Sequence, residues 1–171
     1  MKVTLQTAFK NNMIRQVQIN DLNQCFDIET TAYAGDEAAS KEKIALRINT
    51  YPQGFIVKEI EGKVVGFINS GACHQVELSD EDFKSLVGHD ETGKHIVIMS
   101  VVVHPNYQQQ GIASELMQAF IQQMKDLHKQ DIYLICQTRL IQMYAKSGFK
   151  YLRESDSDHG GLAWHEMKLN L

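Results

Sequence analysis

The stretch HIVIMSVVVHPNYQQQGIASELMQAFIQQMKDLH, residues 95–128, decides the fold of this chain. Its first part, Ile96–Val103, is apolar, rich in β-branched residues and interrupted only by Ser100, which is typical of a strand buried on both faces. Pro105 ends that strand. A helical period follows the three glutamines, and its apolar side chains share one stripe: Ile112, Leu116, Phe120, Met124 and Leu127. The sequence therefore predicts a buried strand that leads directly into an amphipathic helix.

The turn between this strand and this helix reads QQQGIA at residues 108–113. The first backbone amides of a helix have no partners within the helix and lie at the positive end of its dipole, so together they suit a phosphate. Gly111 and Ala113 are small enough to let an anion approach the main chain. A glycine near such a turn is common, however, so the turn by itself is weak evidence.

Together with the strand before it, VVVHPNYQQQGIASELM resembles the central motif of the GNAT superfamily of N-acetyltransferases, Gln/Arg-x-x-Gly-x-Gly/Ala. Gln108, Gly111 and Ala113 fill its three fixed places. The resemblance implies that the turn holds the pyrophosphate of acetyl-CoA and that the strand holds the pantetheine arm through main-chain hydrogen bonds. The cofactor-binding residues it implies are Val101, Val103, Gln108, Gln109, Gln110, Gly111, Ile112, Ala113 and Ser114. No metal is expected.

Composition and charge exclude several other classes of protein. A chain of 171 residues with 43% hydrophobic content is about one domain, here residues 13–171, after an extension at residues 1–12. The net charge of -4 and the absence of a basic cluster argue against a nucleic-acid partner. Three widely spaced cysteines predict reduced thiols and no zinc site. No apolar run is long enough to span a membrane, and the first residues lack the apolar core of a signal peptide, so a cytoplasmic location is expected.

The remaining periodicities predict the other elements of the fold. The predicted strands are 13–19, 54–60, 64–68, 132–136, 149–153 and 162–169, and the predicted helices are 20 to about 33, 37 to about 49, and 138–146. This order matches what the GNAT resemblance implies: an α/β (α+β mixed) fold, with a mixed, mostly antiparallel seven-stranded sheet that is splayed at the cofactor site and flanked by about four helices. The polar insertion at 74–94 is a loop that either covers the site or is simply solvated.

A second motif, MYAKSGF at residues 143–149, matches the Tyr-x-x-x-Gly-Phe pattern of the same superfamily. The resemblance implies that Tyr144 lies beside the sulfur of acetyl-CoA as general acid. A tyrosine, with a reference pKa near 10, can protonate a departing thiolate and stay protonated at neutral pH. The alternative is a tyrosine that only packs in the core.

Three further segments, YAGDEAAS (33–40), QQQG (108–111) and DHGGLAWHEM (158–167), look like the arylalkylamine N-acetyltransferase branch and its bacterial members. That branch acetylates small aromatic amines or polyamines. Vertebrate members carry two histidines on the central strand, where this chain has Val97 and Met99. Some insect members use a glutamate in an early Asp-Glu pair, which residues 36–37 resemble, so Glu37 is the predicted catalytic base. Gln109 stands where the superfamily usually has a second glycine.

Other candidates for the base are His104, His159 and His165. His104 is more typical of a residue at the end of a strand, His165 is expected to face solvent, and Asp158–Gly161 either closes over the amine or forms a plain turn.

The predicted function is transfer of acetyl from acetyl-CoA to the primary amine of a small molecule by direct attack in a ternary complex. The main-chain amide of Val101 would hold the carbonyl oxygen. The alternatives are acetylation of a protein N-terminus or lysine, and a CoA-binding regulatory module without catalysis. The expected partners are the amine and, at most, a second copy of the chain in a homodimer.

Overall fold

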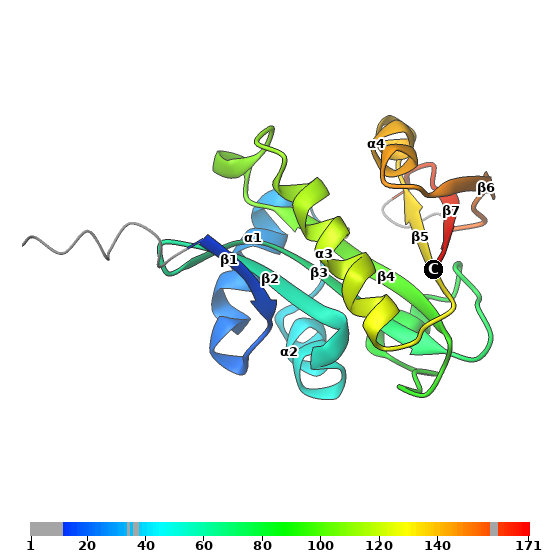
Figure 1. Ribbon diagram of the computed structural model, residues 1–171, viewed down its shortest axis with the longest axis horizontal. Coiled ribbons are helices and arrows are strands. Elements are labelled where there is room, and N and C mark those ends of the chain that lie inside the picture. Colours follow the sequence, from blue (N-terminus) through cyan, green and yellow to red (C-terminus); the bar gives the residue numbers. More distant parts are fainter. Residues whose placement is uncertain (1–11, 34, 36–37, 158–160) are drawn as a thin grey trace, which may run out of the picture.

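A seven-stranded sheet with helices on both faces forms the molecule (Figure 1). The computed structural model describes residues 12–33, 35, 38–157 and 161–171. The strands are β1 (Asn12–Gln16), β2 (Phe55–Ile60), β3 (Lys63–Cys73), β4 (His95–Val103), β5 (Asp131–Cys136), β6 (Lys150–Glu154) and β7 (His165–Asn170). The α-helices among these residues are α1 (Leu22–Ala32), α2 (Lys41–Thr50), α3 (Ile112–Asp126) and α4 (Ile141–Lys146). The sheet order is β1-β2-β3-β4-β5-β7-β6, so the predicted mixed α/β class is confirmed.

The hydrophobic core lies on both faces of the sheet because successive side chains of a strand point to opposite sides. On one face, Phe67 of β3 belongs to a cluster with residues of α1 and α2, including Ile28 and Ile44. On the other face, its neighbour Ile68 belongs to a cluster with α3, including Phe120. β3 is thus buried on both faces beyond Lys63, whereas the side chains of β4 alternate between half-buried and buried as far as Val101, so the prediction that Ile96–Val103 is buried on both faces is only partly confirmed.

The sheet splits between β4 and β5. These two strands run parallel and pair only at their beginnings, where 95–97 faces 131–133. Beyond that point β4 continues to pair with β3, whereas β5 continues to pair with β7. The register of β3 and β4 also shifts, since Asn69 faces Ser100 and Ser70 faces Ile98, which makes Met99 the extra residue of a β-bulge. The splay that the resemblance implied is therefore present in the described part of the chain.

Several predicted boundaries shift for local reasons. The second helix was expected from Glu37 but begins at Lys41, because the Ser40 hydroxyl accepts a hydrogen bond from the Lys43 amide and caps the helix. The last strand begins at His165 and not at residue 162. Asn12, assigned to the extension, is the first residue of β1, and residues 1–11, 34, 36–37 and 158–160 lie outside the described part.

The insertion at 74–94 packs against the body of the molecule through the short 3₁₀ helix η4 (Glu81–Ser85). Phe83 of η4 fits against Gly71, where an added Cβ would lie 2.6 Å from the Phe83 ring. The buried guanidinium of Arg47 on α2 donates to the Lys84 carbonyl, at 2.9 Å from Nη2 and 3.3 Å from Nε. The insertion is thus anchored and is not a free solvated loop.

All three cysteines are buried and form no disulfide. No helix among the described residues is long and apolar enough to cross a membrane.

Candidate active site

The turn at residues 108–114 leaves a row of backbone amides unused. The first helical hydrogen bond of α3 runs from the Glu115 amide to the Gly111 carbonyl at 3.0 Å, so the amides of Ile112, Ala113 and Ser114 precede any helical acceptor. Gly111 has a φ of 80°, and a Cβ built there would meet nothing within 4 Å. The space over these amides is therefore open, and the turn fits a pyrophosphate.

The second residue of this turn, Gln109, has a backbone conformation that usually requires glycine. Gln109 has a φ of 62°, in the left-handed region where a non-glycine residue is strained. This is the position at which the superfamily usually has glycine. The chain thus keeps the backbone shape of the turn although the residue type differs.

The edge of β4 that faces the split carries main-chain groups available to a ligand. The His104 amide donates to the Val65 carbonyl of β3, and alternate residues of a strand point to opposite edges. Val101 and Val103 therefore turn their amides and carbonyls toward the split. Side chains already reach these carbonyls: the Tyr33 hydroxyl donates to Val101 at 3.0 Å, and Gln108 Nε2 donates to Val103 at 3.0 Å.

Tyr144 lies on α4 at the far side of the split and is only 6% exposed. Burial raises the pKa of its hydroxyl above the ordinary value, so the group stays protonated at neutral pH. The Tyr-x-x-x-Gly-Phe motif also has a packing role. Gly148 ends the helix with a φ of 102°, the Phe149 amide donates to the Tyr144 carbonyl, and the two rings lie 6.0 Å apart.

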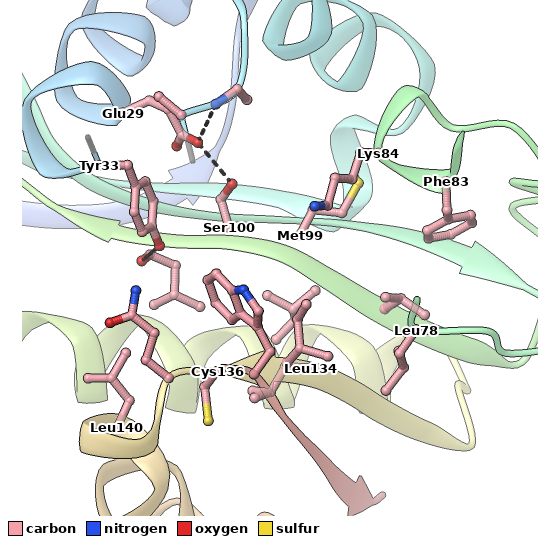
Figure 2. A pocket seen from close by; sticks show the side chains of 18 of the residues that line it. Glu29, Tyr33, Leu78, Phe83, Lys84, Met99, Ser100, Leu134, Cys136 and Leu140 are labelled. Atoms are coloured by element: carbon pink, nitrogen blue, oxygen red, sulfur yellow. Dashed lines mark hydrogen bonds between the residues drawn. The ribbon is translucent and has the colours of Figure 1, made fainter. Parts of the chain in front are cut away.

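A pocket occupies the split (Figure 2). Its walls come from α1 and α2, from the insertion, from β4 and β5, and from the segments around α4 and β7. Its lining includes Glu29, Tyr33, Lys43, Arg47, Leu78, Phe83, Lys84, Val97, Met99, Ser100, Val101, Leu134, Cys136, Arg139, Tyr144 and Trp164. The pocket thus brings Tyr144 and the open edge of β4 at Val101 to one cavity.

Glu29 is the functional candidate that the sequence did not reveal. It lies on α1, is 1% exposed, and its Oε1 accepts hydrogen bonds from the Ala39 amide at 3.0 Å and the Ser100 hydroxyl at 3.4 Å (Figure 2). Oε2 is buried and has no hydrogen-bond partner among the residues that the structure describes. Desolvation raises the pKa of this carboxyl, and Arg47 acts in the opposite direction. The only sequence signal was a charged residue on the apolar side of a helix.

Arg47 is the second buried charge beside the pocket. It is 2% exposed, and burial lowers its pKa to about 10, which leaves it charged at neutral pH. Its hydrogen bonds go to the Lys84 carbonyl and, at 3.5 Å, to Asn69 Oδ1. The nearby charge of Glu29 therefore influences Arg47 electrostatically, whereas the hydrogen bonds of Arg47 are directed elsewhere.

The structure places the other candidate bases in different positions. Glu37 and His159 lie outside the described residues. His104 accepts a hydrogen bond from the Asn106 amide through Nδ1 at 3.1 Å and caps the short turn after β4, in agreement with its reading as a residue at a strand end. His165 lies between the Thr138 hydroxyl, 2.8 Å from Nε2, and the Tyr151 hydroxyl, 3.1 Å from Nδ1.

Comparison with known proteins agrees with this geometry. Residues 19–149 match the model of the acetyltransferase (GNAT) family. The chain is 28% identical over 148 residues to an N-alpha-acetyltransferase of Sulfurisphaera tokodaii, a match that covers 84% of this chain and 83% of that protein. It is 24% identical over 125 residues to the probable hydrolase YhcX of Bacillus subtilis, which covers 69% of this chain. The chain spans only 24% of the length of YhcX.

Solved structures share the fold. The loading GNATL domain of CurA from Lyngbya majuscula superposes with a TM-score of 0.82 at 19% identity, over 94% of this chain and 98% of that one. The protein yncA from Salmonella typhimurium, solved with its cofactor acetyl-CoA, superposes with a TM-score of 0.68 at 19% identity, over 95% of each chain. At these identities the likeness concerns the fold alone. Because the family model covers more than half of the sequence, this chain belongs to the GNAT family of acetyltransferases.

Proposed function

We propose that this chain transfers the acetyl group of acetyl-CoA to the primary amine of a small molecule in a ternary complex. The observation that carries the proposal is the arrangement of three features: the open turn at 108–114, the main-chain groups of Val101 and Val103 on the edge of β4 away from β3, and the pocket that Val101 and Tyr144 line. Acetyl-CoA supplies an activated thioester. The chain supplies the phosphate cradle, the main-chain hydrogen bonds and the groups that move protons.

The cofactor would be held mainly by backbone. The amides of residues 109–114 would bind the pyrophosphate, while Val103 and Val101 would bind the pantetheine arm. For this the Tyr33 hydroxyl and the Gln108 side chain, which now occupy the two carbonyls, leave them or share them. The Val101 amide would then stabilise the developing oxyanion at the thioester carbonyl.

Two proton transfers accompany the reaction. An alkylamine with a pKa of about 10 is almost wholly protonated at pH 7, so it must lose a proton before it can attack. The sequence prediction for the acceptor of that proton is Glu37. Tyr144 would protonate the departing thiolate, and its raised pKa keeps the required proton in place.

The insertion supports a small acceptor over a protein. Five of its residues, Glu77, Leu78, Asp80, Phe83 and Lys84, line the pocket and would take up space that a peptide acceptor needs. The second candidate is acetylation of a protein N-terminus, which the name of the Sulfurisphaera tokodaii relative favours.

The lining further supports a monoamine with an apolar group, as in an arylalkylamine, over a polyamine. The apolar side chains of Leu78, Phe83 and Met99 are part of its lining. Four cationic side chains also line it: Lys43, Arg47, Lys84 and Arg139. Three anionic side chains line it as well, Glu29, Glu77 and Asp80, so four positive charges minus three negative charges leave an excess of one positive charge, which would weakly disfavour a second ammonium group.

The experiment is a spectrophotometric assay of CoA release with arylalkylamines, polyamines and N-terminal peptides. The proposal predicts release with arylalkylamines at a kcat/KM at least 10-fold above that for polyamines. Release with peptides alone would select the second candidate. Binding of acetyl-CoA without release for any amine would leave a CoA-binding module.

A further inference from the structure

Glu29 is a carboxylate that the fold buries at some cost. An ionised carboxylate without full compensation is expensive in an apolar interior. One oxygen of Glu29 is satisfied by Ala39 and Ser100, but Oε2 has no partner among the described residues. A glutamine would provide the same acceptor for those two donors without a charge. The contacts seen in the structure therefore do not require an acid at this position.

The position of Glu29 explains what an acid would do there. Its partner Ser100 directly precedes Val101, whose amide faces the split. Both residues and Glu29 line the same pocket, and Figure 2 shows the carboxylate of Glu29 turned toward β4. An amine that attacks a thioester held at Val101 would approach from this wall of the pocket.

Building on the proposed function, we infer that Glu29 binds the ammonium form of the acceptor through its unpartnered oxygen and takes its proton. Glu29 is then the catalytic base of the acceptor site, and the predicted role of Glu37 becomes the competing assignment. Oε2 has almost no accessible surface in the free protein, so the acceptor must displace the side chains that cover it; its ammonium group then supplies the hydrogen bond that this oxygen lacks.

The ammonium group gives one proton to Glu29 and becomes a neutral amine, whose nitrogen lone pair forms a bond to the carbonyl carbon of the acetyl group. The carbon–sulfur bond breaks as the nitrogen loses a second proton to solvent. The CoA sulfur takes a proton from Tyr144, which solvent restores. Glu29 then releases its proton, so that one proton in total is liberated for each amide formed.

The electrostatic surroundings of Glu29 suit this role. The titratable groups that interact with it are Arg47 from α2 and Cys25, one turn earlier on α1, while β4 contributes the non-titrating Ser100. Burial raises the pKa of Glu29 and makes it a stronger base than an exposed carboxylate, whereas the charge of Arg47 lowers this pKa and favours the ionised form.

The test compares the dependence of kcat/KM on pH in the parent and in Glu29→Gln. If ionised Glu29 binds the ammonium form, the parent gives a bell that falls below the pKa of Glu29 and above that of the amine. Glu29→Gln can use only amine that is already neutral. At neutral pH its kcat/KM should be reduced at least about 100-fold relative to the parent. As the pH increases, its kcat/KM should rise steadily until the pH reaches the pKa of the amine.

A weakly basic primary amine, such as a fluorinated alkylamine, separates catalysis from folding. This acceptor is largely neutral at pH 7, so Glu29→Gln should lose at least 10-fold less activity with it than with a simple alkylamine. Asp27→Asn is the matched control, because Asp27 lies exposed on the same helix and carries the same charge. That control should retain the bell.

Three other outcomes would contradict the assignment of Glu29 as the base. An equal loss with both amines would assign Glu29 a structural role and overturn the inference. So would a bell retained in Glu29→Gln but lost in Glu37→Gln, which would return the base to Glu37. If the parent protein binds acetyl-CoA but releases no CoA with any amine, the proposed function itself fails, and this inference fails with it.

Discussion

At the scale of single residues, Gly111 carries the clearest test of cofactor binding. Gly111→Val would place a β-branched side chain in the open space over the amides of α3 and strain a backbone at a φ of 80°. We expect acetyl-CoA binding to fall below detection in calorimetric titration. Gly62→Val is the matched control, since Gly62 has a φ of 79° and equally open surroundings in the turn between β2 and β3. It should show similar backbone strain and normal binding of acetyl-CoA. Unchanged affinity for acetyl-CoA in Gly111→Val would contradict the assignment of the turn at 108–114 as the pyrophosphate site.

Tyr144 tests the proposed general acid, because its hydroxyl can be removed while its ring is kept. The Tyr144→Phe variant keeps the ring contact with Phe149, so the fold should persist. We expect kcat to fall about 100-fold to 10,000-fold with little change in KM for acetyl-CoA, because a general acid acts as the thiolate leaves. Steady-state and single-turnover kinetics measure this. A variant with an unchanged chemical step would show that Tyr144 serves only in packing.

Glu29 also predicts how stability depends on pH. Its folded pKa is raised above the ordinary 4.5, so between these two pKa values the folded state binds more protons than the unfolded state. The free energy of unfolding therefore falls as pH rises through this window, by about 1.4 kcal/mol for each unit between the two values. Glu29→Gln removes this loss and should be more stable than the parent near neutral pH, with the difference vanishing near pH 4. Denaturant titrations at several pH values test this, and a difference independent of pH would contradict it.

At the scale of elements, Arg47 links α2 to the insertion that closes the pocket. Arg47→Met would leave the Lys84 carbonyl and Asn69 Oδ1 without this donor, at a cost of about 1–3 kcal/mol. The loss should be concentrated in η4, whose end is marked by the Leu86 and Val87 amides. Hydrogen exchange at these two amides should accelerate more than exchange in β3. An equal acceleration in both elements would show that Arg47 supports the whole core and not the insertion specifically.

Some of these elements could be predicted from the sequence and others could not. The central strand, α3 and the hairpin were predictable because their apolar periods follow the strand and helix repeats, and local motifs placed the turn at 108–114 and Tyr144. The predicted start of α2 at residue 37 was wrong because Ser40 caps the helix, which only its contact with the Lys43 amide shows. Glu29 was invisible because a charged residue in a helix normally faces solvent, and its burial depends on long-range contacts with Ser100 and Ala39.

At the scale of the whole molecule, the split makes stability depend on the ligand. The two parts of the sheet are joined between β4 and β5 by only three residue pairs, 95–97 with 131–133. A cofactor bound in the split would contact both parts. At 100 times its Kd it should stabilise the protein by about 2.7 kcal/mol, a rise in Tm of roughly 5–10 °C for a chain of this size. Thermal melts with acetyl-CoA measure the shift, and exchange protection should extend to β5 and β7. A shift without protection there would indicate binding outside the split.

The bulge at Met99 changes which face of the sheet the side chains of β4 point to. Before it, the even-numbered Ile96 and Ile98 belong to the cluster under α3; after it, the even-numbered Val102 belongs to the cluster under α1 and α2. One inserted residue therefore exchanges the two faces halfway along a single strand. Ser100, which an unbroken alternation would direct toward α3, meets Glu29 instead. The bulge thus decides which face of the sheet Ser100 lies on, and with it the contact between Ser100 and Glu29.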